Sequence, residues 1–202
     1  MQLIQAQIHD ALLLLAVVNP IGNIPIYADL TRDCERKERG RIVNIAVAIS
    51  LCLVIAFSLV GDWSLRNIFD VTIDEFKIAG GILLFIVAVR GVMSGVNSYT
   101  DALSDRRMLA VFPLAFPIIV GPGTLAVTII LAQSAGPAQM VMVSLITFLI
   151  VFVIARNSHL LMRLVGPYGG MIIPRLLYVF LASKAVAMVL EGIVTFLKTN
   201  GQ

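Results

Sequence analysis

The sequence has 202 residues, of which 59% are hydrophobic and 13% charged, and its mean hydropathy is +0.96. Soluble domains are about 45–50% apolar and about 25% charged, so this composition excludes an ordinary cytosolic enzyme and a disordered chain. The net charge of +3 does not indicate nucleic-acid binding, because the Lys and Arg residues lie between apolar runs instead of on one polar face. We therefore predict an integral membrane protein.

Six apolar segments follow one another along the chain. A helix that crosses the hydrocarbon core needs about 20 predominantly apolar residues, and the predicted spans are residues 11–28, 42–60, 76–93, 108–131, 138–155 and 176–197. The fold class is therefore an all-α membrane protein with six transmembrane helices. Ala79, Gly80 and Gly81 in the third span are small, which predicts that another helix approaches this span closely.

The basic residues predict the orientation of these spans. Five lie in residues 29–41, two in 94–107 and three in 156–175, whereas the opposite side has Arg66 and the tail residue Lys198. Regions rich in Lys and Arg are cytoplasmic under the positive-inside rule. We expect one compact bundle over residues 1–202, with both termini outside.

The number of spans also suggests an internal repeat. Three spans in each half give the halves opposite topology, so residues 1–101 and 102–202 are predicted to be two inverted three-helix repeats. The first span of each half contains helix breakers, which are Asn19 to Pro25 in one half and Gly121 to Thr124 in the other. Interrupted segments in matching positions are typical of secondary transporters built from inverted repeats.

The chemistry of a broken helix favours a binding site there. Proline removes a backbone donor and costs about 3 kcal/mol in a helix interior, and such backbone survives at membrane depth only where protein or a water-filled cavity surrounds it. The N–H groups of the next half-helix then suit a carboxylate. The alternative is that these residues only kink the helices. The candidate substrate-binding residues are Asn19, Pro20, Gly22, Asn23, Pro25, Gly121, Pro122, Gly123 and Thr124.

Ionisable residues within the spans are candidates for coupling. Lys184 lies about 12 Å along the last span at 1.5 Å per residue, where it either takes part in substrate or proton coupling or is satisfied by the carbonyls of a broken helix. Glu191 lies about 10 Å further along the same helical face. Asp10 either carries a proton or caps the first span at the interface.

The motifs resemble those of a known family. Residues 19–26, Asn-Pro-Ile-Gly-Asn-Ile-Pro-Ile, resemble the signature of the MarC family of bacterial inner-membrane proteins, and residues 112–124, which include Pro113 and Pro117, are similar to its second motif. Residues 78–85 are similar to its third span. The family is related to the lysine-exporter superfamily of small transporters, and some relatives are described as carrying small neutral amino acids. The resemblance implies an inner-membrane location, with both termini periplasmic.

The expected function is a secondary transporter that moves a small zwitterionic amino acid by alternating access, in export or exchange, driven by protons, Na⁺ or no ion. A structural or regulatory membrane protein and a passive channel are the alternatives. No enzyme is expected, because His9 and His159 fall at opposite boundaries and no nucleotide-binding motif is present. We expect no metal, cofactor or nucleic-acid partner; the partners are the lipid bilayer and the solute, and a homo-oligomer remains open.

Overall fold

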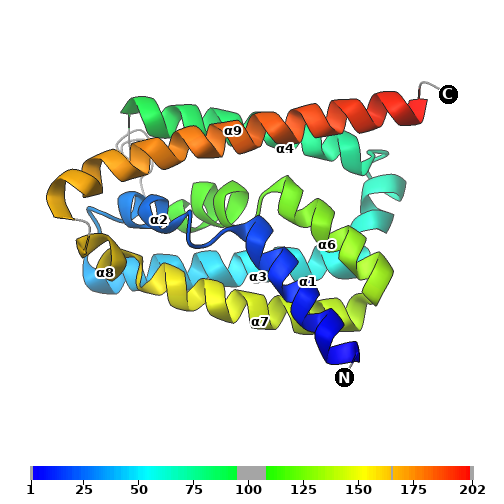
Figure 1. Cartoon of the computed structure of the whole chain (residues 1–202), viewed down its shortest axis with the longest axis horizontal. Helices are drawn as coiled ribbons and strands as arrows, with labels where there is room; N and C mark the ends of the chain where they lie inside the picture. The colour runs from blue at the N-terminus through cyan, green and yellow to red at the C-terminus, as the bar shows by residue number, and fades with distance from the viewer. Residues whose placement is uncertain (1, 95–107, 165, 201–202) are drawn as a thin grey trace.

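The computed structural model describes residues 2–94, 108–164 and 166–200 (Figure 1). Helix follows helix throughout these residues. The predicted basic segment 94–107 lies outside the described residues except for Ser94. The elements are α1 (Gln2–Val18), α2 (Ile24–Leu30), α3 (Arg36–Asn67), α4 (Ile73–Ser94), η1 (Ala110–Ile119), α6 (Pro122–Ala135), α7 (Pro137–Arg156), α8 (Ser158–Arg163) and α9 (Gly166–Asn200).

Four of these helices, α3, α4, α7 and α9, are long and apolar enough to cross a membrane, and the bent pair of η1 and α6 makes a fifth candidate. Large apolar side chains such as Leu149 and Leu190 face outward, as lipid contact requires. The first predicted span, residues 11–28, is divided between α1 and the short α2. Neither helix alone is long enough to cross a membrane. Six spans therefore stay a prediction.

Both predicted helix breaks occur in the structure. α1 ends at Val18, and Asn19 adopts a left-handed conformation with φ 48° before α2 begins at Ile24. η1 is not a regular helix, because Phe112 and Phe116, which each precede a proline, have extended backbone angles. α6 then starts at Pro122 after a bend of 58°.

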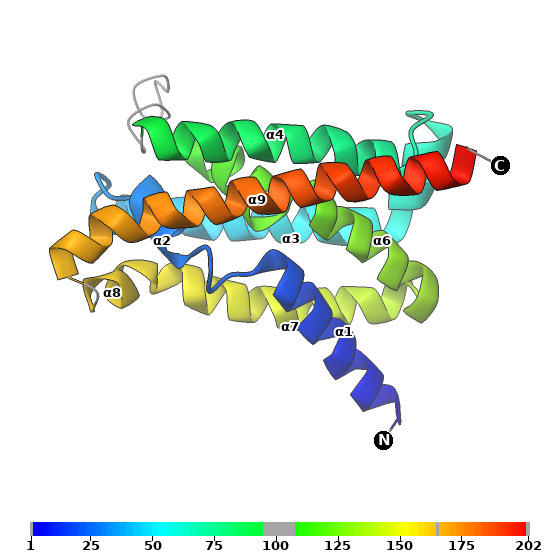
Figure 2. The ribbon, with the colours of Figure 1, turned by 45° about the horizontal axis from the view of Figure 1, so that its top comes forward.

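The long helices form two pairs on opposite sides of the broken segments. α4 lies antiparallel beside α9, and α3 packs on α7, with α2, η1 and α6 between the pairs (Figures 1 and 2). Glycines allow this closeness: a Cβ on Gly81 would lie 2.9 Å from the Ala185 carbonyl oxygen, and one on Gly192 would lie 2.9 Å from the Asp74 carbonyl oxygen. The close approach predicted for the third span is confirmed.

Two of the predicted cytoplasmic loops, residues 29–41 and 156–175, are largely helical. α3 already begins at Arg36, and α8 and α9 occupy most of residues 156–175. The loop boundaries expected there were wrong, because hydropathy marks the part of a helix that lies in lipid, while the helix itself continues into water. Both termini lie toward the end of the molecule opposite α8 (Figure 1). The side of the membrane on which they lie stays a prediction.

A half-buried histidine, His159, joins the end of α2 to α8 at the α8 end of the molecule. The Thr31 hydroxyl donates to the Tyr27 carbonyl at 2.8 Å, so its oxygen accepts from His159 Nε2 at 2.9 Å. Arg39 donates to the carbonyls of Thr31 at 3.3 Å and of Cys34 at 3.1 Å. Burial, and then the charges of Arg39 and Arg163, lower the pKa of His159 from 6.5 to about 4.

We expect Gly80→Ala to destabilise the protein, because the added methyl group would overlap the ring of Pro122. Overpacking of this kind costs about 1–3 kcal/mol. The thermal midpoint of the purified protein measures the effect. Ala79→Val is the matched control, since the Ala79 side chain is exposed. Equal midpoints for the two variants would contradict this packing.

A second prediction concerns pH. Between about pH 6.5 and pH 4 the unfolded chain binds a proton at His159 that the folded chain does not, so stability falls as the pH falls through this range. Because solvent reaches part of the ring, the loss should be about 1–2 kcal/mol. His159→Gln keeps a donor for Thr31 without titrating, so its thermal midpoint should fall less between pH 7.5 and pH 4.5. The same fall in both proteins would contradict the prediction.

Candidate functional site

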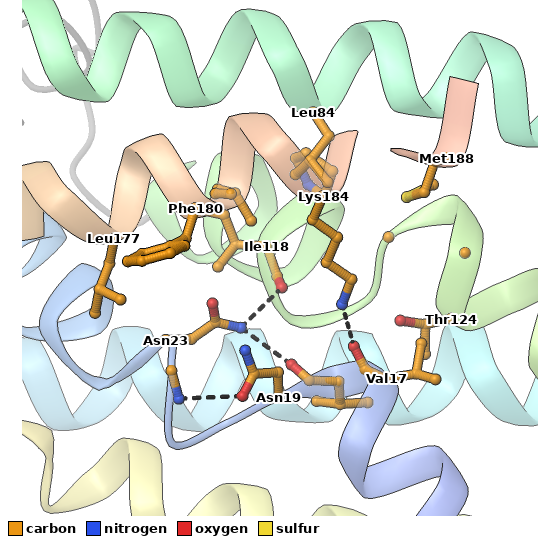
Figure 3. Close-up of a pocket in the computed structure, with 16 residues that line it drawn as sticks. Val17, Asn19, Asn23, Leu84, Ile118, Thr124, Leu177, Phe180, Lys184 and Met188 are labelled. Atoms are coloured by element: carbon orange, nitrogen blue, oxygen red, sulfur yellow. Dashed lines mark hydrogen bonds between the residues drawn. The ribbon is translucent and has the colours of Figure 1, made fainter. Parts of the chain in front are cut away.

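A cavity of about 80 Å³ lies where the two breaks meet (Figure 3). α1 contributes its last carbonyl groups, the turn before α2 contributes two asparagines, and the start of α6 and the middle of α9 complete the cavity. Seven residues named from the sequence line it: Asn19, Gly22, Asn23, Gly121, Gly123, Thr124 and Lys184.

The break in α1 frees backbone carbonyls, and side chains replace the missing donors. Pro20 has no N–H group and so cannot bond to the carbonyl one turn earlier. Lys184 Nζ donates to the Val17 carbonyl oxygen at 2.6 Å. The Asn23 side-chain amide donates to the carbonyl oxygens of Val18 at 3.0 Å and of Ile118 at 3.3 Å. Asn23 therefore joins the broken segments of the two halves (Figure 3).

Asn19 and Gly22 shape the turn between α1 and α2. Asparagine tolerates the left-handed conformation that Asn19 adopts. The side-chain oxygen of Asn19 accepts a hydrogen bond from the Gly22 N–H at 3.3 Å. A Cβ at position 22 would overlap the Asn19 amide, so glycine permits this close contact.

The start of α6 presents backbone donors to the cavity. Gly121 is extended, Pro122 opens the helix, and the Leu125 N–H is the first to bond back, to the Gly121 carbonyl at 3.0 Å. The N–H groups of Gly123 and Thr124 lie in the first turn, where no helical carbonyl precedes them. A Cβ on Gly123 would lie 3.3 Å from Met188 Sδ, so this turn is closely packed against α9.

Opposite helix ends therefore meet at one cavity. The carboxyl end of α1 carries partial negative charge and the amino end of α6 partial positive charge. Lys184 is the charged residue among the described residues that line the cavity. This arrangement can bind a small solute that has an acceptor group and a donor group at its two ends.

Five predicted residues do not line the cavity. The three prolines, Pro20, Pro25 and Pro122, are buried and act on the backbone that surrounds it. The Asp10 carboxylate accepts a hydrogen bond from the Gln139 side-chain amide at 3.3 Å, near the start of α7. Glu191 is exposed, two turns along α9 from Lys184. The structure therefore separates both carboxylates from the candidate site.

The apolar residues that line the cavity were not predicted from the sequence. Leu177, Leu181 and Met188 line it with Lys184, at spacings of four, three and four residues along α9, and Phe180 and Leu84 complete this side. That spacing defines one face of a helix. A search for apolar neighbours on the face of Lys184 identifies them from the sequence.

The chain is similar to proteins of known family. A model described as MarC family integral membrane protein matches residues 4–197. A UPF0056 membrane protein of Archaeoglobus fulgidus is 34% identical, with 89% of this chain and 88% of that protein covered. The UPF0056 inner membrane protein YhgN of Escherichia coli K12 is 30% identical, with 95% of this chain and 98% of that protein covered. No solved structure matches.

Asn23→Leu should destabilise the protein, because it leaves two buried carbonyls without their side-chain donor. An unsatisfied buried group costs about 1–3 kcal/mol. Asn67→Leu is the matched control, since Asn67 also donates to a backbone carbonyl but is exposed, and its effect should stay within about 0.5 kcal/mol. Thermal midpoints in detergent compare the two, and equal losses would contradict the role of Asn23.

Proposed function

The chain belongs to the MarC family of integral membrane proteins, and from this premise we propose that it is a secondary transporter. Residues 1–101 and 102–202 act as two inverted repeats that rock around the cavity between the broken helices. The solute is small, and small neutral amino acids are the proposed class. The observation that carries this proposal is the meeting of two oppositely charged helix ends at one cavity.

Contacts between the halves support the repeat. Ser50 in α3 donates to the Ala115 carbonyl of η1 at 3.2 Å. Thr147 in α7 donates to the Ala11 carbonyl of α1 at 3.5 Å. In each case the second long segment of one half bonds to the broken segment of the other half. Such reciprocal contacts are expected of two halves related by a pseudo-two-fold axis.

The packing around the cavity also fits the repeat. α4 packs directly on α6, with Gly80 against Pro122. The corresponding elements of the other half are α9 and α2, which also pack on each other. The side chain of Lys184 extends from α9 to the end of α1 across the cavity.

The size of the cavity and the two helix ends that meet there favour a small solute such as an amino acid. A water molecule takes about 30 Å³ in the liquid, so a cavity of about 80 Å³ holds about two or three water-sized groups and restricts the occupant to a small solute. The amine of such a solute suits the carbonyl end of α1, and its carboxylate suits the N–H groups of Gly123 and Thr124.

Coupling and orientation are part of the same proposal. Lys184 lines the cavity and is placed to respond to the solute, whereas Asp10 and Glu191 act from a distance if they couple transport to protons or Na⁺. The basic residues near α8, among them Arg36 and Arg163, favour a cytoplasmic position for that end and a periplasmic position for the termini.

Counterflow in proteoliposomes tests the proposal. Vesicles that contain the full chain are preloaded with unlabelled alanine or glycine, and we expect saturable uptake of the labelled solute. Thr124→Val and Asn19→Gly, which keeps the left-handed backbone, should each lower the rate about tenfold, as loss of a hydrogen-bonding group predicts. Ser134→Ala, in α6 but outside the cavity, is the matched control. Flux that never saturates indicates a channel, and no flux of either amino acid through folded protein contradicts the amino-acid assignment and leaves a different solute or a structural role.

A further inference from the structure

The side chain of Lys184 lies where the amine of a bound amino acid belongs. It extends from α9 across the cavity, and its ammonium group donates to the Val17 carbonyl oxygen at 2.6 Å (Figure 3). Val17 is the penultimate residue of α1, so this carbonyl lies at the negative end of the half-helix. The side chain of Lys184 and the amine of an amino acid are both primary ammonium groups and compete for the same carbonyl.

The positive charge of Lys184 has no partner of opposite charge in the cavity. The other lining residues that the structure describes are neutral. The ion pairs of the described residues join other groups, such as Lys77 with Asp74 at 4.0 Å and Arg66 with Asp62 at 2.9 Å. A cation held at membrane depth without a carboxylate is unfavourable, and a bound anion removes that cost.

The charge balance distinguishes two kinds of solute. A zwitterionic amino acid brings a second ammonium group into the cavity and leaves the net charge at one positive unit. A monocarboxylate without an amine brings one negative charge and makes the occupied cavity neutral. The ammonium of Lys184 and the start of α6 line the same cavity and are both available to its carboxylate, and a second proton of the ammonium can serve the carboxylate while Lys184 keeps its bond to Val17.

We propose that Lys184 is a specificity-determining residue that makes this chain prefer a small monocarboxylate anion over the amino acid of the same size. This inference rests on the proposed transport function and specifies its solute. The ammonium of Lys184 replaces the amine of the solute in the subsite formed by the carboxyl end of α1.

Lactate and alanine test the inference, because they have the same number of non-hydrogen atoms and differ in a hydroxyl against an ammonium group. In proteoliposomes of the full chain, the half-saturating concentration for lactate counterflow should be at least tenfold lower than that for alanine. Lys184→Met should remove this preference or reverse it. Lys184→Gln keeps an N–H donor without the charge and should behave like Lys184→Met.

Lys77→Met is the matched control, because Lys77 lies in α4 outside the cavity and pairs with Asp74; it should leave both half-saturating concentrations unchanged. Wild-type protein that favours alanine, or treats the two solutes alike, overturns the inference while leaving transport intact. A Lys184→Gln variant that retains the lactate preference also overturns it. Exchange of neither solute by folded wild-type protein contradicts the transport function itself. The wild-type comparison needs no variant to fold.

Discussion

The structure depends on how a broken backbone is satisfied away from water. α1 ends at Val18, and the turn at Asn19 and Pro20 leaves the last carbonyls of the helix without their helical donors, for which lipid offers no replacement. Asn23 and Lys184 supply the missing donors, at 3.0 Å to Val18 and 2.6 Å to Val17. Because such carbonyls are costly when unpaired, the positions of these two side chains are constrained as strongly as those of the backbone.

The donors come from other parts of the chain, so satisfying the break also assembles the bundle. Asn23 reaches the Ile118 carbonyl in the second half, and Lys184 reaches α1 from α9. The two breaks are thereby held at the same level, and a cavity forms between them. Close packing of α4, through Gly80 against Pro122, then closes one side of this region.

The groups that stabilise the break are also those available to a solute. Under the proposed transport function, a carboxylate or an amine that enters the cavity would exchange hydrogen bonds with Lys184, Asn19 or the first turn of α6, which all line it. A solute would then replace partners that the protein already holds, which lowers the cost of its binding and release.

The membrane class, the all-helical fold and both helix breaks can be predicted from the sequence, because hydropathy and the chemistry of proline and glycine act over a few residues. The sequence also identified Asn23 and Lys184 as polar groups at depth. The helix ends depend on the three-dimensional structure, since α3 begins at Arg36 beyond its apolar part. The structure was also needed to place Lys184 at the cavity, because that position depends on which face of α9 meets α1. Contacts between distant segments arise from packing, and local patterns do not encode them.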